Sequence, residues 1–162
     1  MHVALDLKLL LLLATANGIP VLAKTIFGHR LAHPLDGGTL LWDGQPLLGP
    51  AKTFRGVVLS IVLTGALASA VRLAWQIGVL IAVAAMAGDA CSSFWKRRLK
   101  LPSSSRAIGI DQMPESLLPL LACAIVLPLS VSDVVAIGCC FFVGELLLSR
   151  VLYRFHLRDQ PY

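Results

Sequence analysis

The sequence has few charged residues. Asp, Glu, Lys and Arg make up 14% of the chain and hydrophobic residues 57%, whereas an average soluble domain is about a quarter charged. A soluble chain of 162 residues could not bury so much apolar surface, because small domains leave much of their surface in water. The composition therefore excludes an ordinary soluble domain. It predicts an all-α, polytopic membrane protein with one integral domain over residues 1–162 and no separate soluble module.

Cysteine is also scarce, and none of it forms a recognisable motif. The four cysteines are Cys91, Cys123, Cys139 and Cys140, and all lie in apolar stretches without a C-x-x-C pair. This pattern is typical of small buried side chains and indicates neither a redox centre nor a zinc site.

Five apolar segments are long enough, or nearly so, to cross a bilayer. A spanning helix needs about 20 mainly apolar residues, and backbone buried in lipid must satisfy its own hydrogen bonds. The fourth segment is the weakest, because Pro119 and Pro128 interrupt it. The helices are expected at residues 3–27, 56–73, 75–94, 116–130 and 134–153.

The first segment shares some features with a secretory signal peptide. Ala14-Thr15-Ala16 resembles a cleavage site, but Asp6 lies in the would-be basic region and the apolar run resumes at Ile19. We therefore expect a retained first helix.

The connections between these segments predict an orientation. With five spans, the two long polar loops, residues 28–55 and 95–115, share one side with the C-terminus. Twelve basic residues lie on that side and two, Lys8 and Arg72, on the other. The positive-inside rule then predicts a multi-pass protein of the inner (cytoplasmic) membrane, with the N-terminus outside and both loops and the C-terminus cytoplasmic. The twelve are Lys24, Arg30, Lys52, Arg55, Lys96, Arg97, Arg98, Lys100, Arg106, Arg150, Arg154 and Arg158. This asymmetry explains the net charge of +5 without nucleic-acid binding.

Polar residues interrupt the first apolar segment at Asn17-Gly18-Ile19-Pro20. One interpretation is a kink satisfied by neighbouring helices; the other is a broken helix that lines a polar site. Lys24 follows and either extends to the membrane interface or faces an anionic ligand.

The first long loop combines glycines with basic and hydroxyl side chains. Glycines allow the backbone close to a ligand, and Lys52, Thr53 and Arg55 are donors suited to phosphate. The spacing is wrong for a P-loop. The alternative is a solvated basic loop that contacts lipid headgroups.

The densest polar cluster ends the third apolar segment. Asp89, Ser92, Ser93 and Lys96 share one helical face, and Arg97 and Arg98 follow. A carboxylate inside a membrane helix is costly and points to function, although an internal ion pair with a basic neighbour is the plainer explanation.

A second acidic cluster precedes the fourth segment. Asp111 and Glu115 could simply cap that helix. If Asp89 and Asp111 both reach the same membrane boundary, two carboxylates beside basic residues suit a Mg²⁺ that bridges phosphate oxygens. Glu145, within the last segment, could pair across the bundle or serve the site.

Taken in order, these motifs resemble the CDP-archaeol synthase family, which is related to the phosphatidate cytidylyltransferases. The resemblance covers essentially the whole chain. The matching residues are Asn17-x-x-Pro20, Pro34-Leu35-Asp36-x-Gly38, Asp43-Gly44, Leu47-Leu48-Gly49, Lys52-Thr53-x-Arg55-Gly56, Gly88-Asp89-x-x-x-Ser93-Phe94-x-Lys96-Arg97-Arg98 and Ile110-Asp111-Gln112.

The resemblance implies a transfer of cytidylyl from CTP to a phosphorylated lipid alcohol, of diacyl- or dialkyl-glycerol phosphate type, which yields a CDP-lipid and pyrophosphate with Mg²⁺. It implies that Asp89 and Asp111 hold Mg²⁺. The cations implied to bind the two phosphate groups are Lys52, Arg55, Lys96 and Arg97. Further residues implied to contact substrate are Asn17, Lys24, Thr53 and Ser93, and Asp36 is implied to contact cytidine, Lys52 or a metal.

Two positions depart from the family pattern. Ala51 stands where glycine usually precedes the loop lysine, and Met113-Pro114-Glu115-Ser116 replaces an acidic-aromatic pair after Asp-Gln. The second departure resembles bacterial members more than archaeal ones.

Two other classes fit less well. A small transporter or channel would place Asp89 and Glu145 on its path, but such proteins often carry repeated halves, and the sequence has none. A non-catalytic membrane scaffold would need no carboxylate inside the membrane.

Overall fold

The computed structural model describes residues 3–102, 107 and 109–154, with side chains as far as residue 150. Within this part of the chain the protein is all-helical and has no strand beyond two isolated bridges in the first long loop. The helices are α1 (Val3–Phe27), α2 (Phe54–Ala70), α3 (Trp75–Arg98), α4 (Gln112–Val126) and α5 (Val131–Arg154). The all-α prediction is confirmed for the described residues.

Three helices are long and apolar enough to cross a membrane: α1, α3 and residues 131–150 of α5. The other two, α2 and α4, are apolar but shorter. The expectation of five crossings therefore stays a prediction.

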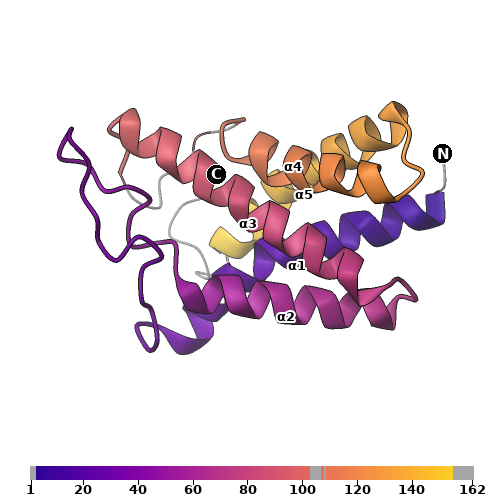
Figure 1. Ribbon diagram of the computed structural model, residues 1–162, viewed down its shortest axis with the longest axis horizontal. Coiled ribbons are helices and arrows are strands. Elements are labelled where there is room, and N and C mark those ends of the chain that lie inside the picture. Colours follow the sequence, from indigo (N-terminus) through magenta and orange to yellow (C-terminus); the bar gives the residue numbers. More distant parts are fainter. Residues whose placement is uncertain (1–2, 103–106, 108, 155–162) are drawn as a thin grey trace.

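The helices form an elongated bundle with its connections at two ends (Figure 1). Helix α3 packs against α2 and α4, while α1 contacts α2, α3 and α5. Leu9, Leu12 and Leu13 of α1 meet Ala82 and Ala85 of α3 in the core. The long loops after α1 and α3 lie at one end, and the turns α2–α3 and α4–α5 lie at the other (Figure 1).

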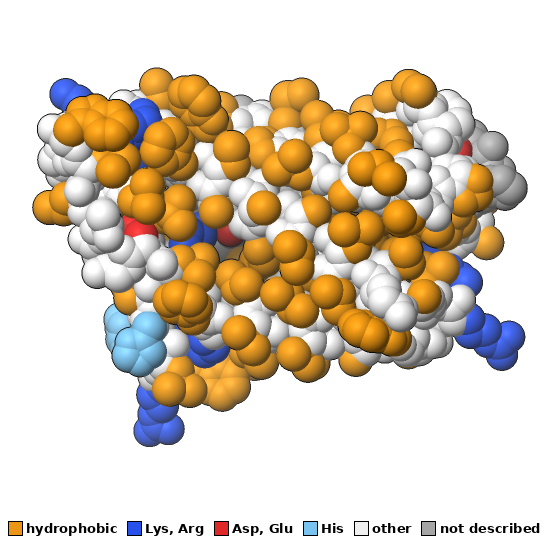
Figure 2. Space-filling model, viewed as in Figure 1, with side chains coloured by type: hydrophobic (Ala, Val, Ile, Leu, Met, Phe, Trp, Pro, Cys, Tyr) orange, Lys and Arg blue, Asp and Glu red, His pale blue; other side chains and the backbone are white. Residues whose placement is uncertain are grey.

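Large apolar side chains cover the outside of the bundle. Val62 is 59% exposed, Ile125 85% and Val143 54%. Figure 2 shows this hydrophobic surface over the middle of one face, with Lys, Arg and His gathered toward its ends. An apolar belt between charged ends suits a protein surrounded by lipid.

Two glycines set how closely α3 approaches its neighbours. A Cβ on Gly78 would lie 2.4 Å from the carbonyl oxygen of Thr64 in α2. A Cβ on Gly88 would lie 2.2 Å from the carbonyl oxygen of Pro114 in α4. Any larger residue would push the helices apart, so Gly88 fixes the residue that follows it, Asp89, beside the first turn of α4.

The ends of α2 and α3 differ from those expected. Helix α2 begins at Phe54 rather than 56, because the preceding Thr53 is its N-cap and accepts the Gly56 N–H on Oγ1 at 3.2 Å. It ends at Ala70, three residues before the expected 73. Helix α3 continues to Arg98, four residues past the expected end at 94, since basic residues are favourable in the last turn of a helix.

The last two helices both begin earlier than expected. Helix α4 begins at Gln112 rather than 116 and ends at Val126, before Pro128. Helix α5 begins at Val131 rather than 134, and the carboxylate of Asp133 in its first turn accepts the backbone N–H of Ser130 at 3.0 Å.

Helix α1 runs unbroken through Asn17 and Pro20. The side chain of Asn17 donates to the carbonyl oxygen of Leu13, one turn earlier, at 3.0 Å. The broken-helix interpretation of this segment is therefore wrong.

Candidate active site

Polar side chains are buried along the last three turns of α3. Ser92 is fully buried, and Ser93, Lys96 and Arg97 are each less than 8% exposed. Burial of a charged group in an apolar bundle is costly unless a partner compensates it. The prediction that this face gathers a polar centre is consistent with that burial.

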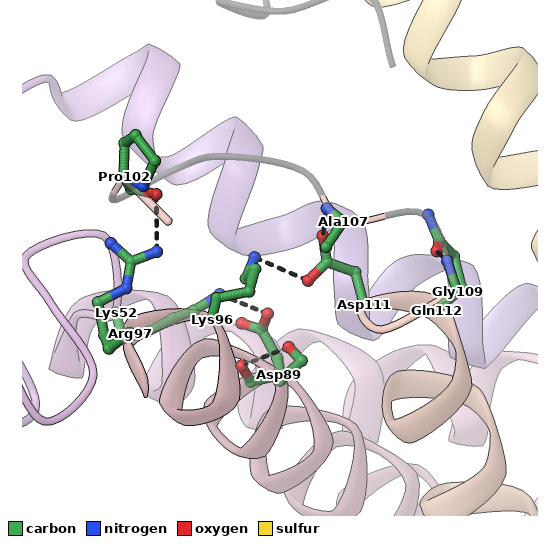
Figure 3. A network of polar contacts seen from close by, with 10 residues as sticks. Lys52, Asp89, Lys96, Arg97, Pro102, Ala107, Gly109, Asp111 and Gln112 are labelled. Carbon is green, nitrogen blue, oxygen red and sulfur yellow. Dashed lines mark hydrogen bonds and ion pairs between the residues drawn. The ribbon is translucent and has the colours of Figure 1, made fainter. Parts of the chain in front are cut away.

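The first partner comes from the long loop before α2. The ammonium of Lys52 forms an ion pair with the carboxylate of Asp89 (Figure 3). Burial alone would lower the pKa of Lys52, but the charges of Asp89, Glu115 and Asp111 outweigh it and raise the pKa above its ordinary value. Lys52 therefore stays charged at neutral pH, and the internal ion pair expected as the plainer explanation for Asp89 is present.

A second buried ion pair joins the end of α3 to the start of α4. Lys96 Nζ lies 2.7 Å from Asp111 Oδ1, and both side chains are less than 10% exposed. The other oxygen, Asp111 Oδ2, accepts the backbone N–H of Ala107 at 3.0 Å (Figure 3). Asp111 makes no side-chain capping bond to α4 itself, so it holds the preceding turn and Lys96 rather than capping the helix.

The two ion pairs Lys52–Asp89 and Lys96–Asp111 form the polar centre of the bundle. Glu115 also belongs to this centre, although the sequence pattern indicated only a place in the first turn of α4. The charges of Glu115 and Asp89 act on each other, and Glu115 is 8% exposed. The close contact of Gly88 with Pro114 and the Glu115 backbone places these two acidic residues on adjoining turns of α3 and α4. The available signal was its spacing, because Glu115 follows Asp111 by four residues and shares its helical face.

Two of the expected phosphate-binding arginines contact backbone carbonyl groups instead. Arg55 donates to the carbonyl oxygens of Gly28 and Arg30, which follow the end of α1 at Phe27. Arg97 donates to the carbonyl oxygen of Pro102 at 2.7 Å (Figure 3). In the structure, therefore, Lys52 and Lys96 form ion pairs with acidic side chains, whereas the guanidinium groups of Arg55 and Arg97 are hydrogen-bonded to nearby backbone carbonyl groups.

The basic residue after Arg97 fastens the long loop to α3. Arg98 forms an ion pair with Asp43 at 3.2 Å and donates to the carbonyl oxygen of Pro46 at 2.7 Å. Its guanidinium also lies over the Phe94 ring, 5.2 Å from the centroid. Arg98 therefore anchors the loop that carries Lys52.

The remaining predicted substrate contacts are dispersed. Asn17 is bonded within α1, and Lys24 is exposed near the end of that helix. Thr53 caps α2, while Ser93 is buried beside the centre on α3. Two basic residues that contributed to the charge asymmetry lie outside the described residues, Arg106 and Arg158.

Asp36 organises the long loop from within. Its carboxylate accepts three backbone N–H groups, from Gly38 at 3.0 Å, Leu48 at 2.9 Å and Gly49 at 2.8 Å. The neighbouring Leu35 N–H bonds the carbonyl oxygen of Lys52 at 2.8 Å. Although burial would raise the pKa of Asp36, these hydrogen bonds lower it below the ordinary 3.8. Asp36 thus holds the backbone around Lys52.

We expect Asp36→Asn to loosen this loop in a pH-dependent way. An amide group cannot accept three N–H bonds as a carboxylate does, and hydrogen bonds to a charged group contribute about 1.5–3 kcal/mol. Because the folded pKa lies below the unfolded one, the stabilisation is present above pH 3.8 and is lost as the pH falls through the folded pKa. The gap in thermal stability between wild type and variant should be largest near neutral pH and should close below pH 3.8. If the difference in thermal stability between wild type and Asp36→Asn were the same near neutral pH and below pH 3.8, this role of Asp36 would be contradicted.

The acidic residues do not form a complete metal site on their own. Among the described residues, no three His, Cys, Asp or Glu side chains lie close enough together to hold an ion. Mg²⁺, however, is commonly bound by one or two carboxylates together with substrate phosphates. The donor set at the centre, largely buried carboxylates, is the chemistry that Mg²⁺ prefers.

Comparison with known proteins identifies the family. A sequence model described as CarS-like, CDP-archaeol synthase, matches residues 3–162. The chain belongs to the CDP-archaeol synthase family. A CDP-archaeol synthase of Pyrobaculum calidifontis is 32% identical over 152 residues, which cover 91% of this chain and 90% of the relative. One from Sulfurisphaera tokodaii is 32% identical over 135 residues, covering 80% and 81%.

A solved structure agrees with this family. It is described as an intramembrane enzyme for archaeal membrane lipids biosynthesis, and it superposes with a TM-score of 0.72 at 26% identity, covering 85% of this chain and 90% of its own. The resemblance inferred from the motifs is therefore confirmed. The interpretation as a bacterial member stays a prediction, and the transporter alternative is not favoured.

Proposed function

We propose that the protein is a CTP-dependent cytidylyltransferase that converts CTP and a phosphorylated lipid alcohol into a CDP-lipid and pyrophosphate. The substrate is a glycerol phosphate with two acyl or alkyl chains. The observation that carries this proposal is the pair of largely buried lysine–carboxylate contacts, Lys52–Asp89 and Lys96–Asp111, at the loop end of an apolar bundle. Family membership supports the type of reaction.

The proposed arrangement in the membrane has five crossings, with α2 and α4 as the short ones. The N-terminus is outside, and both long loops and the C-terminus face the cytoplasm at the inner membrane. The excess of basic residues at the loop end supports this orientation. It gives the centre access to cytoplasmic CTP and to a lipid phosphate in the adjacent leaflet.

The reaction requires two anions to meet. An oxygen of the lipid phosphate attacks the α-phosphorus of CTP, the new P–O bond forms, and the bond to pyrophosphate breaks. The protein's part is to position the two anions and to stabilise the negative charge that develops on the leaving group. Lys52 and Lys96 supply positive charge for this task, Ser93 and Thr53 supply hydroxyl donors, and Arg97 adds a guanidinium at the same end of α3.

Asp89 and Asp111 are proposed to hold a Mg²⁺. Their carboxylates are hard oxygen donors on α3 and at the start of α4, 18% and 9% exposed, and so fit this ion. When bound, the ion neutralises charge on the phosphate oxygens.

The proposal is tested by assaying the protein purified in detergent. With CTP, Mg²⁺ and either phosphatidic acid or a dialkylglycerol phosphate, we expect pyrophosphate release in proportion to the CDP-lipid formed. Comparing the two lipids identifies the chain type, and omission of lipid should stop release. Absence of pyrophosphate with every lipid phosphate, together with no CTP binding, would refute the proposal.

A further inference from the structure

Lys52 lies in the polar centre as a cation among carboxylates. Its ammonium is paired with Asp89, and the residue before Asp89, Gly88, packs directly on the backbone of Glu115. The negative charge of Asp111 also favours the charged form of Lys52. A divalent cation held by Asp89 would need the oxygens that the ammonium now contacts.

We propose that Lys52 competes with the divalent ion for Asp89, and that Glu115 joins the cation site only once the ammonium has left, since in the described residues these carboxyl groups do not yet form a metal-binding group. This inference rests on the proposed function. It extends that function by stating that the divalent ion replaces the Lys52 ammonium at Asp89 when nucleotide binds. An incoming triphosphate attracts Lys52, which frees the Asp89 carboxylate for the ion. Nucleotide and divalent cation then strengthen each other's binding, because each removes the other's competitor.

The packing of α3 on α4 supports the place of Glu115. A Cβ on Gly88 would lie 2.9 Å from the Glu115 backbone nitrogen, so the chain has almost no freedom to separate Asp89 from Glu115. Asp111, by contrast, is held by Lys96 and by the Ala107 N–H. Glu115 is therefore the acidic residue whose backbone is fixed directly beside Asp89.

The test measures Mn²⁺ binding without nucleotide, by the electron paramagnetic resonance signal of the free ion. Removal of the competing ammonium in Lys52→Met should raise Mn²⁺ affinity at least about fivefold, the lower range of coupling between sites. Lys100→Met, which removes an exposed positive charge at the same end of α3, should leave it unchanged. Adding Glu115→Gln to Lys52→Met should reverse the gain. Equal or weaker Mn²⁺ binding in Lys52→Met, or full binding in the double variant, would overturn the proposal.

A second measurement uses wild type and does not depend on whether these variants fold. Acylation of Lys52 by an amine reagent, quantified by mass spectrometry, should increase when Mg²⁺ alone is added, since the ion displaces the ammonium. Labelling of Lys100 serves as the internal reference. No change at Lys52 under saturating Mg²⁺ would contradict competition. Neither readout requires turnover, so loss of the proposed enzymatic function would be seen separately, as absence of pyrophosphate release by wild type.

Discussion

Asp89→Asn is expected to abolish measurable turnover while the protein still inserts into the membrane. The substitution keeps the shape of the side chain but removes the charge that pairs with Lys52 and is proposed to hold the divalent ion. Loss of one preorganised electrostatic contact at a reaction centre costs about 10²–10³-fold in kcat. Because Asp89 serves both cations, we expect a loss at the upper end of that range or beyond it, measured as pyrophosphate release per minute.

Asp6→Asn is the matched control for this variant. Asp6 lies in the first turn of α1, at the end of the bundle opposite the long loops (Figure 1). Both of its carboxylate oxygens are buried without a hydrogen-bond partner among the described residues, so removing the charge should not weaken the fold, and turnover should remain close to wild type. Full activity in Asp89→Asn would remove this residue from the proposed metal site. Because Asp89→Asn also takes away the carboxylate that Lys52 contacts, thermal unfolding in detergent is measured alongside, and a loss of turnover that only follows a loss of folded protein would contradict the catalytic role.

The helices were predictable because apolar length is a strong signal. Each of the five apolar segments corresponds to a helix, and α1 was expected with its observed limits, Val3–Phe27. The ends of α3 and α4 were less predictable. They depend on the contacts of polar residues such as Lys96 and Asp111, which extend helical structure beyond the apolar stretch.

The sequence was enough to predict most of the residues that form the polar centre, but not which of them would contact one another. A carboxylate in an apolar helix, Asp89, marked the centre from sequence alone. Nothing in the spacing could show that Lys52, thirty-seven residues earlier, would be its partner, because that contact depends on the loop that Asp36 and Arg98 hold in place. Glu115 was missed because its position suggested a helix start, and only the close approach at Gly88 places it against Asp89.

The second large effect is expected at the other buried ion pair. Lys96→Met removes the ammonium that Asp111 contacts, and Asp111→Asn removes the carboxylate 2.7 Å from Lys96; breaking a buried ion pair destabilises a protein by about 3–5 kcal/mol. Each single variant should therefore unfold at a lower temperature and lose turnover. The measurements are thermal unfolding in detergent and pyrophosphate release.

The double variant Lys96→Met/Asp111→Asn separates these two losses. It has no unpaired charge, and the amide oxygen that replaces the Asp111 carboxylate can still accept the Ala107 N–H, so most of the thermal stability should return. Turnover should not return, because both the positive charge offered to phosphate and the carboxylate offered to the divalent ion are gone. A double variant that recovered activity along with stability would mean that the pair only holds α3 to α4. A double variant that recovered thermal stability but not turnover would show that Lys96 and Asp111 take part in the reaction, because the fold would then not depend on their charges while the reaction would.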